Sequence, residues 1–171
     1  MTSAELIKFR AMKDEFFRNN AQSPLTPQQR STFEGLRYFD ENSELRLEIA
    51  IQKFPAQNEF TMQTSTGDEQ TYRRYGEFLF DVNGTQARLT LYASDHGYFL
   101  PFVDSQAGNE TYGAGRYLDP VLLSSGKFLI DFNLAYNPYC AYNENWSCPI
   151  PPSENRIEVP IRAGERNFKA T

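Results

Sequence analysis

The sequence predicts one mainly β domain, an α+β arrangement in which an antiparallel barrel or sandwich of about seven or eight strands follows two helices. Helical periodicity is confined to residues 1–37, whereas apolar and polar residues alternate through much of 38–171, with turn signals between the alternating runs. No linker, composition break or internal repeat divides the chain. We therefore expect residues 1–171 to form a single domain, with a helical N-terminal segment (1–37) and a β-rich body (38–171).

The first predicted helix covers residues 3–19, with Ser3 as a suitable N-cap. This helix is expected to be amphipathic, with an apolar face that carries Leu6, Phe9, Phe16 and Phe17. A short second helix is expected to begin at Thr26, because Pro27 then occupies the first helical position and Gln29 the capping-box position. Gly35 is well placed to end it.

Two-residue alternation begins after Tyr38 and predicts the strands. Asn83-Gly84, flanked by alternating apolar residues, is the strongest signal, because this dipeptide favours the tight turn of a β-hairpin. The strands are expected near 45–51, 60–64, 78–82, 87–91, 98–103, 112–118, 127–133 and 157–162.

Composition excludes several classes of partner. The net charge is −5, and no basic run is present that could neutralise phosphates, so we expect neither a nucleic acid nor an anionic membrane as a partner. The first residues do not have the pattern of a secretory signal, and no apolar run of 18 residues occurs. These features predict a soluble, cytoplasmic protein.

The stretch from Phe99 to Glu165 combines Gly, Pro, Asn, Tyr and charged residues in a pattern typical of a site carried on a scaffold. Within it, Asp131 and Asn133 are two residues apart on a predicted strand and so share a face, opposite to the face that carries Phe128 and Phe132. That polar face either meets solvent or lines a pocket.

Gly113 and Gly115 precede Arg116 in this stretch. The third glycine of a dinucleotide-binding loop is missing and no helical pattern follows, so we expect no nucleotide cofactor, and the glycines favour a bulge or a close backbone approach. Arg116 either clamps a carboxylate or phosphate of a ligand or pairs with an acidic residue of the chain, for which the candidates are Asp119, Asp131 and Glu165.

Cys140 and Cys148 are the two cysteines of the chain, and seven residues separate them. Two cysteines and one histidine are too few for a structural zinc site, and the spacing is not that of a Cys-x-x-Cys redox motif. Three alternatives remain: two small buried residues under a proline-rich loop, a disulfide or close thiol pair, or a nucleophile that pairs with His96. We expect no metal ion.

Seven motifs in the chain together carry a resemblance to a known family: FEGLRYF (33–39), YRRYGEFLF (72–80), LPFVD (100–104), GRYLD (115–119), DFNLAYNPYCAY (131–142), CPIPPSENR (148–156) and IRAGE (161–165). Through these motifs, which span nearly the whole chain, the sequence resembles the domain of unknown function 1684 family of bacteria and archaea. The resemblance implies a single uncharacterised domain and no specific activity. The residues that it emphasises are Tyr112, Arg116, Asp131, Asn133, Asn137, Cys140, Tyr142, Cys148, Glu154, Asn155 and Glu165.

The function that the sequence favours is the binding of a small polar molecule in a pocket formed by the 112–116, 131–142 and 148–156 motifs. The residues expected to contact the ligand are Tyr112, Arg116, Asp131, Asn133, Asn137 and Tyr142. One alternative is a hydrolase-type enzyme, for which the candidate catalytic residues are Asp131 or Glu154 as general base and Cys140 as nucleophile. The other is an interaction module without a ligand.

Overall fold

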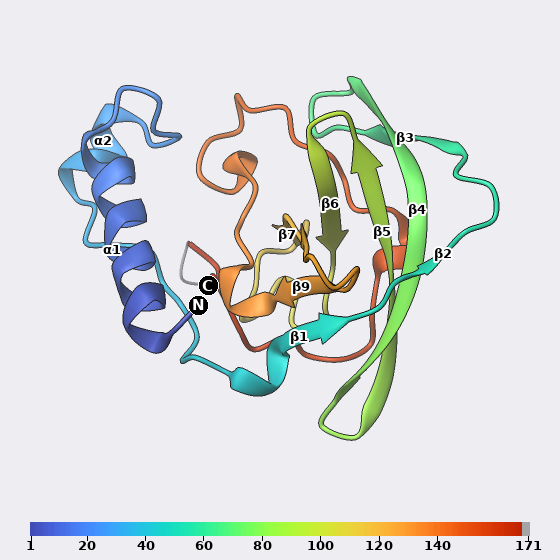
Figure 1. The fold of residues 1–171 in the computed structure, drawn as a ribbon. Coiled ribbons are helices and arrows are strands. Elements are labelled where there is room, and N and C mark those ends of the chain that lie inside the picture. The colour runs from blue at the N-terminus through green and yellow to red at the C-terminus, as the bar shows by residue number, and fades with distance from the viewer. Residues whose placement is uncertain (169–171) are drawn as a thin grey trace.

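Two antiparallel sheets and a long helix make up the protein in a computed structural model, which describes residues 1–168 (Figure 1). The long helix is α1 (Ser3–Asn19), and the short second helix is α2 (Pro27–Ser31). Both predicted helices are confirmed. The N-cap of α1 is Thr2, one residue before the expected Ser3, because Thr2 and Glu5 form a reciprocal capping box. Thr26 and Gln29 form the same box at α2, as predicted.

The larger sheet has the strand order β2-β4-β5-β6-β7, and β3 also pairs with β4. Its strands are β2 (Gln52–Lys53), β3 (Glu59–Gln63), β4 (Glu69–Val82), β5 (Thr85–Ser94), β6 (Gly97–Phe102) and β7 (Arg116–Leu118). The predicted hairpin joins β4 to β5, and both residues of its turn have a positive φ, 51° at Asn83 and 84° at Gly84.

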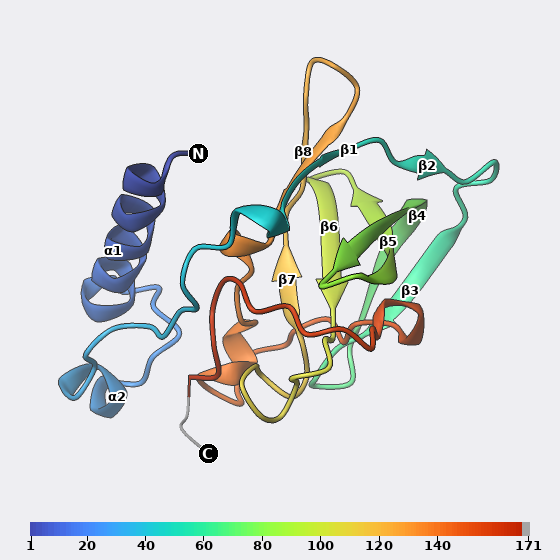
Figure 2. The ribbon, with the colours of Figure 1, turned by 90° about the horizontal axis from the view of Figure 1, so that it is seen from below.

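The smaller sheet has the order β1-β9-β8, in which β1 (Arg46–Ile49) and β8 (Val121–Leu122) flank β9 (Phe128–Asp131). The β8–β9 hairpin projects from the body of the molecule (Figure 2). Within residues 1–168 the two sheets do not close into a barrel, so of the two predicted architectures the sandwich-like one describes this fold.

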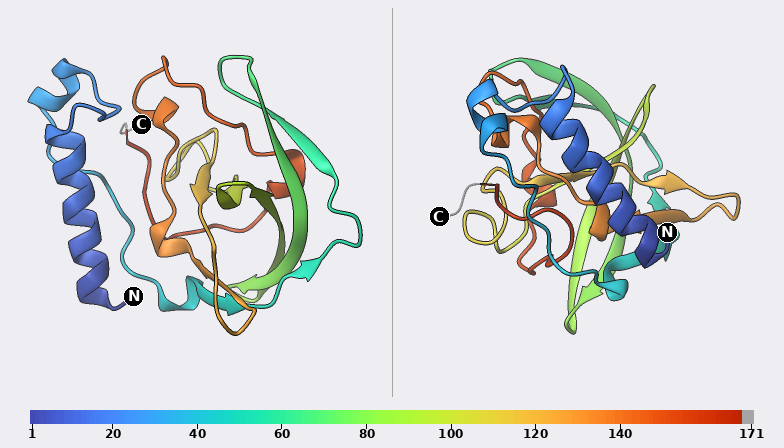
Figure 3. Two further views of the ribbon diagram at one scale, coloured as in Figure 1. Left: turned by 45° about the horizontal axis from the view of Figure 1, so that its top comes forward. Right: turned by 90° about the vertical axis from the view of Figure 1, so that its left-hand side faces the viewer.

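Apolar side chains from both sheets form one core. It contains Phe78, Leu89 and Leu91 of the larger sheet together with Phe128 and Ile130 of the smaller one. A second, smaller cluster joins α1 to the segment that follows β9; its buried members are Phe17, Leu25, Ala141 and Tyr142. Figure 3 shows this arrangement, with α1 alongside the orange segment and the sheets beyond it. The second cluster therefore fixes the position of α1.

The predicted strand at 157–162 is wrong, because this segment makes only isolated backbone hydrogen bonds to residues 103–105 and is otherwise held by side chains. The backbone nitrogen of Ile161 donates to Asp104 Oδ2 at 2.8 Å, and the carbonyl oxygens of Ile161, Ala163 and Glu165 accept hydrogen bonds from Arg116. The side chains of Asp104 and Arg116 thus satisfy polar groups that a strand would present to its neighbour. The alternating burial that suggested a strand is real, since Val159 and Ile161 are buried in the core.

Other predicted strands differ in their bounds. The 45–51 segment is a strand only over β1, and β2 follows it as a separate short strand, while β4 begins well before the predicted 78–82 segment. The 112–118 segment is a strand only from Arg116, and the 127–133 segment leaves the sheet after Asp131. In the last case the Asp131 side chain accepts a hydrogen bond from the Asn133 backbone and caps a 3-10 turn, which ends the strand.

Candidate functional site

Arg116 is buried and contacts the chain itself. Its guanidinium donates to the carbonyl oxygens of Ala163 (2.6 Å), Glu165 (2.9 Å) and Ile161 (2.7 Å), and one nitrogen lies 3.9 Å from Asp104 Oδ2. Burial lowers the pKa of Arg116 to about 10, partly offset by the Asp104 and Glu165 carboxylates, so the group is charged at neutral pH. This side chain clamps the C-terminal segment.

Gly115, which precedes Arg116, makes the close backbone approach that the sequence predicts. Its φ is +99°, and a Cβ atom there would lie 2.6 Å from the carbonyl oxygen of Phe102. A side chain at this position would push β7 away from β6 and displace the Arg116 clamp.

Asp131 and Asn133 form a second, separate group of buried polar side chains. Asp131 accepts hydrogen bonds from Arg46 Nε (2.9 Å) and from Asn133 Nδ2 (2.8 Å). Asn133 in turn exchanges hydrogen bonds with the backbone of Asn42, at 2.8 and 2.9 Å. Both side chains therefore hold the segment before β1 against the end of β9.

Asn137 and Tyr142 belong to a third group, centred on the buried carboxylate of Glu165. Its Oε2 accepts hydrogen bonds from the backbone nitrogen of Asn137 (2.7 Å) and the hydroxyl of Tyr142 (2.9 Å), and its Oε1 pairs with Lys13 of α1. Burial, followed by the Glu165 charge, raises the pKa of Tyr142 well above its usual range, so its hydroxyl stays protonated and donates.

Glu154 and Asn155 lie against the larger sheet. Glu154 accepts two hydrogen bonds from Arg74, at 3.1 and 2.7 Å, and a third from Tyr92. Burial acts to raise the pKa of Glu154, but the hydrogen bonds from Arg74 and Tyr92 outweigh it, so the pKa is lowered, opposite to what a general base at neutral pH requires. The Asn155 side chain bonds the backbone of β5 at Thr90 and of β6 at Pro101.

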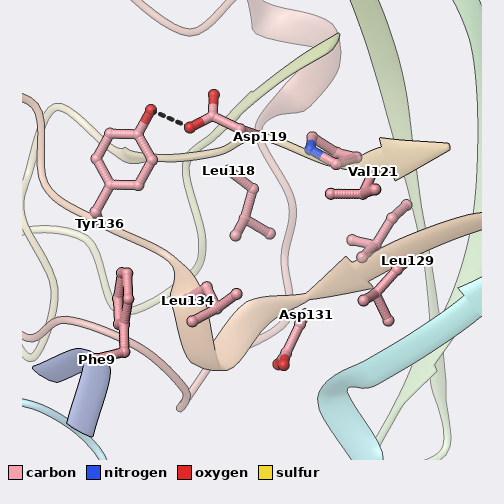
Figure 4. Close-up of a pocket in the computed structure, with 10 residues that line it drawn as sticks. Phe9, Leu118, Asp119, Val121, Leu129, Asp131, Leu134 and Tyr136 are labelled. Atoms are coloured by element: carbon pink, nitrogen blue, oxygen red, sulfur yellow. Dashed lines mark hydrogen bonds between the residues drawn. The ribbon is translucent and has the colours of Figure 1, made fainter. Parts of the chain in front are cut away.

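An apolar pocket of about 180 Å³ lies between α1 and the smaller sheet (Figure 4). Phe9, Leu129 and Leu134 line it, and Tyr136 donates a hydrogen bond to Asp119 Oδ2 at one side (2.9 Å). Asp131 is part of the wall, but its carboxylate is turned away from the apolar side chains. The pocket is smaller than the roughly 300 Å³ typical of small-molecule sites.

A larger cleft, of about 540 Å³, opens beside the loop that carries Cys140. We refer to it as the Cys140 cleft. It is lined by Thr26, Tyr112, Cys140, Ala141, Tyr142, Asn143, Glu144, Asn145 and Asn167. The 3-10 turn Tyr139–Ala141 presents Cys140 to the cleft, and the amide of Gln29 donates to the Tyr142 carbonyl (2.8 Å), which ties the cleft loop to α2.

The two thiols are neighbours at this cleft. Cys140 is half-buried and Cys148 is buried, and the Cys140 backbone nitrogen donates to Cys148 Sγ at 3.3 Å. The Tyr112 hydroxyl lies 3.8 Å from Cys140 Sγ. A hydrogen bond from the Cys148 thiol, helped by those from Tyr112 and Ser65, lowers the pKa of Cys140 to about 6 against the effect of burial, while the same pairing raises that of Cys148.

The predicted ligand-binding residues therefore do not gather at one pocket. Tyr112 and Tyr142 line the Cys140 cleft, whereas Arg116, Asn137 and the Asp131–Asn133 pair are engaged elsewhere. Of the three candidate catalytic residues, Cys140 alone lines this cleft. Contact of any of these residues with a ligand stays a prediction.

Six residues of the cleft are not among the predicted ligand-binding or catalytic residues: Thr26, Ala141, Asn143, Glu144, Asn145 and Asn167. Asn143 lies in the Phe99–Glu165 stretch that the sequence does single out, directly after the 131–142 motif. Thr26 has a visible local role as a helix cap, but no local signal places it opposite Cys140. In the part of the chain that the structure describes, no three His, Cys, Asp or Glu side chains are grouped to hold a metal ion.

The fold and this site define a mainly β, two-sheet domain with a cysteine-bearing polar cleft between its helical segment and its C-terminal loops. The chain belongs to the family described as protein of unknown function (DUF1684), whose sequence model matches residues 31–166. The resemblance drawn from the sequence motifs is confirmed.

A solved structure is similar over nearly the whole chain. It is the solution NMR structure of the uncharacterized protein from gene locus rrnAC0354 of Haloarcula marismortui, with 36% identity, a TM-score of 0.70, and coverage of 95% of this chain and 92% of that one. No curated protein matches the chain. In residues 1–168 no helix is long and apolar enough to cross a membrane.

Proposed function

We propose that the protein binds a small polar molecule in the Cys140 cleft. The observation that carries the proposal is the cleft itself: its volume of about 540 Å³ lies within the range of roughly 300–1,000 Å³ that is usual for small-molecule sites, and hydrogen-bonding side chains line it. Tyr112 and Asn167 offer a hydroxyl and an amide to a ligand.

The charge of the cleft favours a neutral or cationic ligand. Among the described residues that line it, Glu144 is acidic and none is Lys or Arg. The lowered pKa of Cys140 adds a second negative group at neutral pH. A carboxylate or phosphate ligand would meet repulsion here without a cation to offset it.

Hydrogen bonds with residues outside the cleft hold its walls in place, which reduces the conformational entropy that is lost when a ligand binds. Tyr142 is fixed by Glu165 through its hydroxyl and by Gln29 through its carbonyl. Pro138 precedes the turn that carries Cys140 and restricts its backbone. A preorganised wall of this kind favours binding, because fewer groups must be ordered when the ligand arrives.

A thermal-shift screen of the reduced protein tests the proposal. The screen compares neutral, cationic and anionic polar compounds, and we expect stabilisation by members of the first two sets, because a ligand that binds the folded state raises the melting temperature. Calorimetry then measures the affinity of each compound for the wild type and for the variant Asn167→Ala. Loss of one hydrogen bond, about 1 kcal/mol, corresponds to affinity weaker by about fivefold.

Asn58→Ala is the matched control, because Asn58 is an exposed asparagine directly before β3, outside the residues that line the cleft. We expect it to leave the affinity unchanged. Equal loss of affinity in both variants, or stabilisation by anionic compounds alone, would contradict the proposal.

A further inference from the structure

The paired cysteines beside the cleft have a chemistry of their own that does not depend on ligand binding. We infer that Cys140 and Cys148 are a redox-active thiol pair, in which Cys140 reduces a small polar hydroperoxide and Cys148 then closes a disulfide with it. This assigns an activity and a substrate class to the pair.

The positions of the two sulfur atoms carry the inference. Cys140 lines a cleft wide enough for a small peroxide, whereas Cys148 is 7% exposed and lies behind it. The Cys140 backbone nitrogen already lies 3.3 Å from Cys148 Sγ. A sulfur atom in contact with the Cys140 backbone nitrogen is within reach of the Cys140 side chain, so a disulfide between the two residues needs no large movement of the loop.

The surroundings make the two thiols unequal. Hydrogen bonds from Cys148 and from the Tyr112 hydroxyl stabilise a thiolate at Cys140, while Cys148 remains protonated. Since the thiolate is the nucleophile, Cys140 reacts first. A solvent-accessible thiolate next to a second cysteine is the arrangement found in cysteines that respond to oxidants.

The first step transfers one oxygen atom. The Cys140 thiolate attacks one oxygen of the hydroperoxide; an S–O bond forms, the O–O bond breaks, and the departing alkoxide or hydroxide takes a proton from solvent. Sulfur loses two electrons and becomes a sulfenic acid, and the hydroperoxide is reduced to an alcohol or water.

The second step forms the disulfide. The Cys148 thiol loses its proton and attacks the Cys140 sulfur; an S–S bond forms, the S–O bond breaks, and the hydroxyl leaves with the proton as water. An external dithiol reductant returns the pair to its thiol form by exchange. The bridge closes the loop 140–148, which includes Asn143, Glu144 and Asn145 of the cleft wall.

Hydrogen peroxide and intact-mass analysis test the inference on the full chain. With stoichiometric peroxide, the wild type is expected to lose two hydrogen atoms and both free thiols. Cys148→Ser is expected to stop at the sulfenic acid, which dimedone traps at Cys140. Cys140→Ser is expected to give neither the bridge nor the dimedone adduct.

Peptide mapping decides the outcome even where a serine variant does not fold. In the reduced wild type at pH 6, iodoacetamide is expected to label Cys140 at least tenfold faster than Cys148. Equal labelling, a dimedone adduct on Cys148, or oxidation without an intramolecular bridge would overturn the inference. Because these assays contain no ligand and the thermal-shift screen uses reduced protein, the two proposals can fail separately.

Discussion

Arg116 is fully buried, and its guanidinium binds three carbonyl oxygens of residues 161–165. Those carbonyls belong to alternate residues of the C-terminal segment, and the several donors of the planar guanidinium fork bind all three of them. A lysine ammonium also has three donors, but they radiate from one nitrogen and cannot span acceptors that two separate guanidinium nitrogens bind.

Arg116→Lys is therefore expected to destabilise the protein by about 3 kcal/mol, because charge-assisted hydrogen bonds are lost inside the protein. Urea unfolding measures the change. The matched control is Arg88→Lys, since Arg88 is an exposed arginine on β5 whose side chain is 65% accessible, and we expect little change there. A loss below about 1 kcal/mol for Arg116→Lys would mean that the clamp is not needed for stability.

Cys140 has a pKa of about 6, and this value predicts a distinctive pH profile for its alkylation. The thiolate is the reactive form, so the rate is expected to rise as pH increases through about 6 and to level off near neutral pH. At pH 6 an ordinary cysteine has roughly a hundredfold less thiolate, and the lower nucleophilicity of a low-pKa thiolate reduces the advantage of Cys140 to about tenfold.

The variant Cys148→Ala removes the largest cause of the lowered pKa of Cys140. Its profile is expected to shift to higher pH, toward that of a free cysteine. A profile that keeps its inflection near pH 6 would show that Cys148 does not set the pKa of Cys140.

At the scale of elements, α1 is attached to the β-rich body through both apolar and polar contacts. The ring of Phe17 packs edge-on against that of Tyr142, with centroids 5.0 Å apart, and Lys13 pairs with Glu165. Glu165 also holds Tyr142 and Asn137, so one carboxylate joins α1 to the loop that forms the cleft wall. Changes at α1 are therefore expected to reach the cleft.

Glu165→Gln is expected to destabilise the protein by about 3–5 kcal/mol, because it leaves the Lys13 charge without its partner beneath the helix. The double variant Lys13→Met with Glu165→Gln removes both charges and is expected to recover part of this loss. A double-mutant cycle measured by thermal unfolding tests the coupling. Additive losses in the two single variants would mean that Lys13 and Glu165 do not interact energetically.

At the scale of the whole molecule, the prediction of a single domain leads to a single unfolding transition. Trp146 is the one tryptophan of the sequence, and its ring packs against Tyr139 with centroids 5.1 Å apart, so its fluorescence reports on the cleft loop. Far-UV circular dichroism reports on the sheets. We expect the two urea transitions to coincide. An earlier fluorescence transition would mean that the cleft loop and α1 unfold before the β-rich body.

Local chemistry allowed much of the fold to be predicted. The capping residues at Thr26 and Gln29, the Asn83-Gly84 turn and the alternation in β4 and β5 each act within a few residues, so the sequence displays them directly. The strand expected at 157–162 failed for the opposite reason. Its polar groups are satisfied by isolated backbone hydrogen bonds to residues 103–105 and by the side chains of Asp104 and Arg116, all distant in sequence. No local pattern distinguishes that arrangement from regular pairing with a strand.

The candidate site was predictable in composition but not in geometry. The motifs around Tyr112, Cys140 and Cys148 were recognisable as unusual, and the structure brings these three side chains together. The motifs around Arg116 and Asp131 were recognisable in the same way, but in the structure these two side chains form hydrogen bonds that hold other segments of the chain in place. Polar residues that hold loops and polar residues that bind ligands have the same composition, so the sequence could not separate them.

The sequence by itself determined the family, the helical N-terminal segment, the mainly β body and the central hairpin, because each depends on short-range pattern or on motifs within continuous stretches. The tertiary structure alone decided which unusual residues are internal clamps and which line a cleft. It placed α2, the Tyr112 loop and the Cys140–Cys148 loop side by side, and contacts between segments so distant in the chain arise only when the core brings them together.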